Sequence, residues 1–87
     1  MSFRKLRGVN LSEEKQGLIR YTCLNYESMP EWMQRKITRL CDECGGEYSS
    51  ALFSVMTSKR SMTEIALKNY VDESTLYRAR KKFYESW

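Results

Sequence analysis

The chain has 87 residues, of which 41% are hydrophobic, 13% aromatic and 30% charged, and its formal net charge at pH 7 is +4. A chain of this length has apolar surface for one modest core, so we expect a single domain over residues 1–87 and exclude a disordered tail. The sequence contains no histidine, which removes the commonest general base and metal ligand and argues against an enzyme.

The sequence also bears on where the protein acts. No apolar run reaches the about 18 residues of a membrane helix, and the basic start lacks the apolar stretch of a signal peptide. We therefore expect a cytoplasmic protein without membrane contact. Three cysteines, an odd number, are expected to be free thiols, and we expect no cofactor.

Charge is unevenly distributed along the chain. Residues 1–7 contain three basic and no acidic residues, residues 8–58 contain five basic and seven acidic, and residues 59–87 contain seven basic and four acidic. Two basic ends around an acidic middle suit a polyanionic partner, although a merely solubilising surface explains them as well. The N-terminal basic residues predict either a flexible arm that reaches DNA or an unstructured terminus: Arg4, Lys5 and Arg7.

The predicted elements are all helical, because apolar residues recur at spacings of three and four and no strand-like alternation is sustained. Ser12 is suited to cap a first helix over about residues 13–27, with Leu18 and Cys23 on its inner face. Pro30 fits the first turn of a second helix, which the glycines at 45 and 46 end. The fold class is therefore all-α, with about five helices.

The later elements follow the same pattern. A third helix is predicted over about residues 47–57, and a fourth over 62–69, where Ser61 and Glu64 have the capping-box spacing. Asp72 can cap a fifth helix that continues to the end of the chain. Large apolar side chains are expected in the core: Trp32 or Met33, Ile37, Leu40, Phe53, Leu76, Ala79 and Phe83.

Cys41 and Cys44 form a C-x2-C pattern that can be half of a zinc site. A closed site needs four cysteine or histidine ligands, and the chain offers only Cys23 besides. The two cysteines also lie one helical turn apart on an apolar face. We therefore expect packed side chains and no metal.

The last third of the chain is the most informative, because it contains two short amphipathic helices joined by a tight connection, the second of them strongly basic. Ala66 is small enough for two helices to cross closely, and Ile65, Val71, Leu76 and Leu67 can fix their angle. Positions 74, 78 and 81 recur on a face turned away from Leu76 and Phe83. This arrangement is typical of a helix-turn-helix, here assigned to residues 59–87 after an N-terminal arm (1–11) and a helical support (12–58).

The segments Glu64-Ile65-Ala66 and Tyr70 to Arg78, followed by Arg80-Lys81-Lys82, resemble the sigma-factor region-4-like helix-turn-helix, especially of small phage regulators of the RinA and ArpU type. The resemblance covers about the last third of the chain. The sequence departs from the pattern in two places, the turn and the residue before the second helix. Asn69 and Tyr70 replace the leucine and glycine common in the turn, so Asn69 is expected to take the left-handed conformation. Asp72 stands where relatives have serine.

The resemblance implies sequence-specific binding of double-stranded DNA, with the helix from about Asp72 as the recognition helix in the major groove. Residues near its start are expected at base edges, with Arg78 the best candidate to read a guanine: Glu73, Ser74, Thr75 and Arg78. Further residues are expected at phosphates: Lys59, Arg60, Tyr77, Arg80, Lys81 and Lys82.

Other functions remain open from the sequence. The same helix pair can bind RNA polymerase or another protein, or serve a DNA-packaging or recombination accessory. A homodimer is possible, and Trp87 can pack on its own domain or on a second copy. We expect a transcriptional regulator of phage or prophage origin.

Overall fold

The computed structural model describes Leu6 and residues 8–87. Within this part of the chain all regular structure is helical and no strand occurs, which confirms the all-α class. Its five α-helices are joined by short connections, two of which contain a 3-10 turn: α1 (Glu13–Leu24), η1 (Tyr26–Ser28), α2 (Glu31–Gly45), η2 (Gly46–Tyr48), α3 (Ser49–Thr57), α4 (Met62–Lys68) and α5 (Glu73–Ser86). None of the helices in the described part is long and apolar enough to cross a membrane.

Helix ends follow local capping chemistry. The Ser12 hydroxyl accepts a hydrogen bond from the Lys15 amide at 3.2 Å at the start of α1, as predicted. The helix ends at Leu24 rather than near residue 27, because the Asn25 side chain donates to the Tyr21 carbonyl and η1 follows. At the end of α2, Gly46 has a φ of 55°, a conformation that glycine adopts without steric cost.

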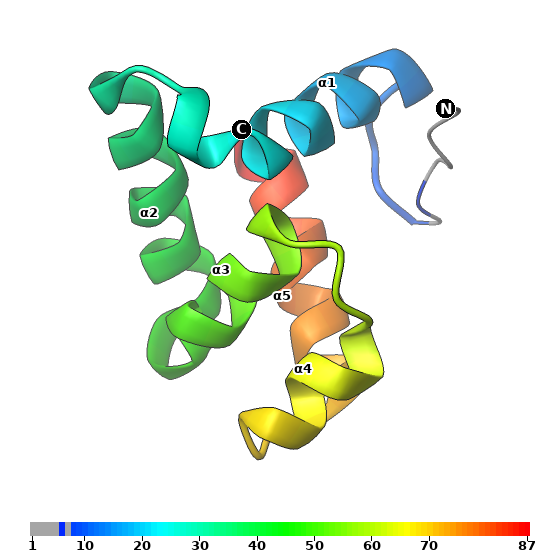
Figure 1. Cartoon of the computed structure of the whole chain (residues 1–87). Helices are drawn as coiled ribbons and strands as arrows, with labels where there is room; N and C mark the ends of the chain where they lie inside the picture. Colours follow the sequence, from blue (N-terminus) through cyan, green and yellow to red (C-terminus); the bar gives the residue numbers. More distant parts are fainter. Residues whose placement is uncertain (1–5, 7) are drawn as a thin grey trace.

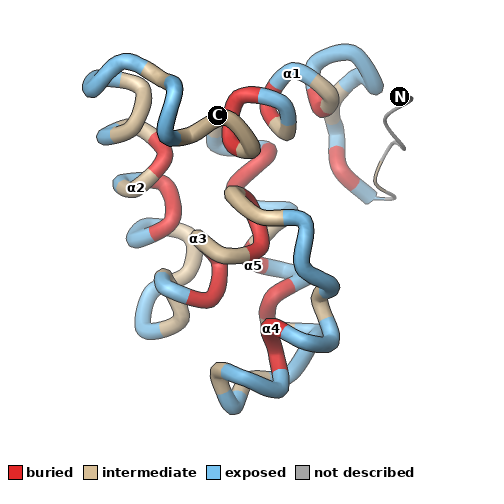
Figure 2. Tube along the Cα trace, in the orientation of Figure 1, coloured by how far each residue is buried: buried red, intermediate tan, exposed pale blue. Residues whose placement is uncertain are grey.

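The helices pack around α5, as Figure 1 shows. This helix contacts α2, α3 and α4, while α3 also contacts α1 and α2. The connection between α4 and α5 lies at the opposite end of the molecule from α1. Buried stretches of the chain line the sides of the helices that face one another (Figure 2).

The core differs from the prediction on α1, and on α2 it contains one of the two predicted residues. Ile19 is fully buried, whereas its neighbour Leu18 is 63% exposed. Trp32 is 66% exposed and Met33 packs against the core instead. Phe53 is half-buried. The predicted core residues of α2 and α5 are all buried: Ile37, Leu40, Leu76, Ala79 and Phe83. Tyr84 is buried as well, although it was not predicted.

A half-buried arginine joins α1 to the end of α3. The Arg20 guanidinium donates hydrogen bonds to the carbonyls of Val55 (2.6 Å), Met56 (2.9 Å) and Ser58 (2.9 Å). The last carbonyls of a helix have no partner within the helix, and a cation is favourable beside them. Arg20 therefore fixes the direction in which the chain leaves α3 toward α4.

A buried amide holds the segment before α1 in place. Gln16 is fully buried; its Oε1 accepts from the Leu6 amide at 2.9 Å, and its Nε2 donates to the Leu11 carbonyl at 3.1 Å. Val9 is buried in the core. The described part of the predicted arm is therefore packed, while Arg4, Lys5 and Arg7 lie outside the described residues.

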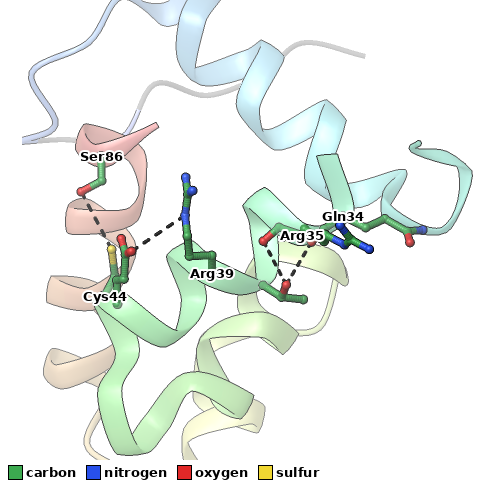
Figure 3. Close-up of polar contacts among 7 residues, drawn as sticks. Gln34, Arg35, Arg39, Cys44 and Ser86 are labelled. Carbon is green, nitrogen blue, oxygen red and sulfur yellow. Dashed lines mark hydrogen bonds and ion pairs between the residues drawn. The ribbon is translucent and has the colours of Figure 1, made fainter. Parts of the chain in front are cut away.

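The end of α5 is attached to α2. The Trp87 ring lies beside Phe83, with ring centroids 6.0 Å apart, and Lys36 Nζ lies 4.3 Å from the centroid of Trp87. Figure 3 shows a second contact between the same helices, in which Cys44 Sγ lies 3.9 Å from Ser86 Oγ. Trp87 thus packs on its own domain.

Candidate nucleic-acid interface

The C-terminal helix pair, residues 61–87, is held together by hydrogen bonds around a short connection. Ser61 caps α4 by accepting from the Glu64 amide at 3.1 Å, as the capping-box spacing predicts. After α4, the Val71 amide donates to the Ala66 carbonyl at 3.1 Å and turns the chain back toward α5. Ile65 and Ala66 are buried beneath this turn, whereas Leu67, predicted to fix the helix angle, is 73% exposed.

The left-handed residue of the connection is Tyr70, with a φ of 55°, and not Asn69 as predicted. Asn69 has a φ of −102°, and its side-chain amide donates to the Ile65 carbonyl at 2.8 Å. The asparagine therefore stabilises the end of α4 through its side chain, while the following residue carries the steric strain. The ring of Tyr70 is 95% exposed, so no packing in the described structure offsets that strain.

Two acidic residues stand at the start of α5. Asp72 occupies the N-cap position without a side-chain hydrogen bond to the helix, contrary to the prediction that it caps α5. The Glu73 carboxylate accepts a hydrogen bond from the Thr63 hydroxyl of α4 at 2.9 Å. Glu73, predicted at a base edge, thus also ties the two helices together.

The remaining predicted site residues of α5 lie on one side of the helix. The opposite side is buried, with Leu76 and Phe83 fully enclosed. The exposed residues alternate with them at helical spacing: Ser74, Tyr77, Arg78, Lys81 and Lys82. Thr75 and Arg80 are half-buried at the margins. From Ser74 to Tyr84 the helix carries four basic residues and no acidic one, so its exposed face is positively charged.

Arg80 differs from the other cations of this face. Its guanidinium carbon lies 5.0 Å from the centroid of the Tyr77 ring, in a cation–π contact. Burial lowers the pKa of Arg80, and the neighbouring Arg20 cation lowers it further, while Tyr84 and Tyr77 act in the opposite direction. Burial likewise raises the pKa of Tyr84. Arg80 is therefore a partly desolvated cation beside aromatic rings.

Lys59 and Arg60 are exposed in the connection that leads into α4. Arg20 holds the carbonyl of the preceding Ser58, so the start of this connection is fixed. Arg60 lines a cleft of about 280 Å³ between α3 and α4, together with Lys68 and Asn69. Arg60 thus lies on the α3 and α4 side of the helix pair, separate from the exposed residues of α5.

The cysteines lie away from this face. Cys23 and Cys41 are buried and Cys44 is half-buried, and all three are free thiols. Burial raises the pKa of Cys23 and of Cys41 to about 12. Among the described residues, no three His, Cys, Asp or Glu side chains gather as ligands of a metal ion would.

Comparison with protein-family models, curated proteins and solved structures finds no match for this chain. The likeness to sigma-factor region-4-like domains therefore stays a prediction from the residues of the C-terminal third.

Proposed function

We propose that the protein is a regulator that binds double-stranded DNA in a sequence-specific manner, with α5 as the recognition helix of a helix-turn-helix. The observation that carries the proposal is the exposed face of α5, which presents Ser74, Arg78, Lys81 and Lys82. The opposite, apolar side of the helix is packed in the core. An exposed helix of this kind fits the major groove of B-DNA, and its cations can release the counterions of phosphates.

The geometry supports different roles for the residues of this face. Ser74 and Arg78 lie one helical turn apart in the first half of α5, the half that reaches base edges in this class of motif. Lys81 and Lys82 lie further along the helix, where the groove turns away and phosphates come within reach. Glu73, already hydrogen-bonded to Thr63, contributes mainly by fixing the angle between α4 and α5.

A second function is favoured by one observation. Leu67 and Tyr70 are strongly exposed at the connection of the helix pair, and they line a surface hollow with Val71, Asp72 and Glu73. Exposed apolar side chains gathered in a hollow are typical of a protein-binding surface. This arrangement supports the alternative that the helix pair binds a protein such as RNA polymerase.

The two functions are separated by selecting a preferred duplex from a random library and measuring its affinity for the variants Arg78→Ala and Lys82→Ala at several salt concentrations. For a DNA regulator, Arg78→Ala costs about 1–3 kcal/mol on the preferred site and relaxes selection at one base pair. Lys82→Ala weakens binding to all sequences alike and lowers the salt slope by about one unit.

Two further variants serve as controls. Arg39→Ala removes an exposed cation of α2 that is not part of the proposed binding face of α5, and it leaves DNA affinity unchanged. Leu76→Ala leaves a cavity in the core and lowers the free energy of unfolding by about 2–5 kcal/mol, so it tests whether binding requires the folded helix pair. A folded wild-type protein without salt-sensitive affinity for any duplex contradicts the proposal and favours a protein partner.

A further inference from the structure

The positively charged face of α5 adjoins the N-terminal segment, which was predicted to be a separate arm. A pocket of about 230 Å³ opens between this segment and the middle of α5. Residues far apart in sequence line it: Leu6, Val9, Tyr77, Arg78, Arg80 and Lys81. Three of the six are cations and none is acidic.

The wall that the N-terminal segment contributes is fixed by hydrogen bonds. Gln16, fully buried, accepts from the Leu6 amide, and Val9 is inserted into the core. The Asn10 amide donates to the Glu85 carboxylate of α5 at 3.2 Å. The Glu85 carboxylate, which lies one helical turn beyond Lys81, is therefore already hydrogen-bonded to the N-terminal segment. The segment is therefore attached to α1 and to α5 on either side of the pocket.

The side chains that line the pocket favour an anion with an apolar neighbour. Arg80 is half-buried, and within the described part of the chain it forms neither an ion pair nor a hydrogen bond through its side chain. The Arg80 guanidinium lies beside the Tyr77 ring, and its planar set of donors matches two oxygens of a phosphate. The Leu6 and Val9 side chains offer apolar surface beside these donors.

We propose that this pocket binds a phosphate group of the DNA backbone, with Arg80 as its principal ligand and Leu6 as the apolar wall against the adjoining deoxyribose. The inference rests on the proposed DNA-binding function and adds the N-terminal segment to the binding surface. Arg78 and Lys81 are the exposed cations of the pocket lining and Arg80 is half-buried, so a strand that passes along α5 meets the exposed cations before Arg80.

The experiment combines Arg80→Gln, Arg80→Lys and Leu6→Ser with a 20-base-pair duplex of random sequence as the probe, about two turns of B-DNA. Arg80→Gln lowers the salt slope of binding by about one unit, because one fewer phosphate is neutralised. Arg80→Lys keeps the slope but weakens binding, since an ammonium lacks the planar fork. Leu6→Ser weakens binding with the slope unchanged. Arg39→Gln on α2 is the matched exposed control.

Amide NMR of the wild-type protein gives a readout that does not depend on folding of the variants. Titration with the duplex shifts the Leu6 and Val9 amides together with those of Tyr77 to Lys81. Inorganic phosphate and a deoxynucleoside monophosphate are titrated separately to distinguish the source of the phosphate. If either small molecule shifts the Leu6 and Val9 amides while the duplex does not, the ligand is a free phosphate compound and the backbone assignment is wrong.

The failure of this inference differs from that of the proposed function. If Arg80→Gln and Leu6→Ser bind the duplex as the wild type does while Lys82→Ala still weakens binding, the pocket is not part of the DNA site and the recognition helix stands. If Arg78→Ala, Lys82→Ala and Arg80→Gln all leave binding unchanged, both the pocket assignment and the proposed function are overturned.

Discussion

Tyr70 is, among the described residues, the only one other than glycine with a positive φ. The left-handed conformation costs an L-amino acid roughly 1–2 kcal/mol, because Cβ approaches the following carbonyl oxygen. The exposed ring regains none of this through packing. The strain is confined to the four-residue connection between α4 and α5, and it gives a test of the geometry of the helix pair.

Tyr70→Gly should raise the free energy of unfolding by up to about 1 kcal/mol, since relief of the strain exceeds the extra entropy of the unfolded glycine. Urea unfolding measures the change. Tyr70→Ala is the matched control: it keeps the strained backbone and removes only an exposed ring, so it should stay within about 0.5 kcal/mol of the wild type. Equal effects of the two variants would show that the connection is not left-handed at residue 70.

At the scale of elements, Arg20 connects α1 to the C-terminal end of α3. Replacing it by methionine keeps an apolar stem and removes three hydrogen bonds to carbonyls. We expect the free energy of unfolding to fall by at least about 1.5–3 kcal/mol, the contribution of a single hydrogen bond to a charged group. Thermal or urea unfolding followed by circular dichroism measures the loss.

Arg35→Met is the control for this substitution. Arg35 forms an exposed ion pair with Glu31 on α2, which should contribute less than about 1 kcal/mol. If Arg20→Met destabilises the protein no more than Arg35→Met does, Arg20 does not hold the end of α3.

The starts of α1 and α4 were predictable because they depend on neighbours in sequence. Ser12 and Ser61 accept the hydrogen bonds that their spacing from the first turn predicts. The inner face of α1 was not predictable, because Leu18 and Ile19 are adjacent and both apolar. About 100° of helix rotation separates them, and only packing against other helices decides between the two.

The candidate site was predictable in part. The exposure of Ser74, Arg78 and Lys81 follows from their spacing relative to Leu76 and Phe83. Sequence analysis missed Gln16 and the pocket beside Arg80, because buried polar side chains are rare and their partners are distant in sequence. The left-handed position was misplaced by one residue, since an asparagine more often takes that conformation than a tyrosine does.

The core of the molecule contains buried titratable groups from three helices. Burial raises the pKa of Cys23 on α1 and Cys41 on α2 to about 12, and it also raises the pKa of Tyr84 on α5. In the unfolded chain the thiols ionise near their ordinary pKa of 9.0. The folded state therefore binds more protons than the unfolded state between pH 9 and 12.

Stability should accordingly be independent of these thiols below pH 9 and fall as the pH rises above it. Each thiol contributes a slope of about 1.4 kcal/mol per pH unit until its folded pKa is reached. Urea unfolding between pH 8 and 11 measures the slope. The double variant Cys23→Ala and Cys41→Ala should show a shallower decline, and an unchanged slope would mean that the two thiols titrate alike in both states.

The two tryptophans occupy opposite environments, Trp32 exposed on α2 and Trp87 packed beside Phe83 and Lys36. Their fluorescence therefore has two sources that iodide separates, because a solvent-exposed indole is quenched far more readily than a packed one. Trp32→Phe leaves an emission that reports only whether the end of α5 is docked on α2. Without any added dye, the fluorescence of Trp87 thus reports whether the end of α5, the helix with the exposed cations, detaches from α2.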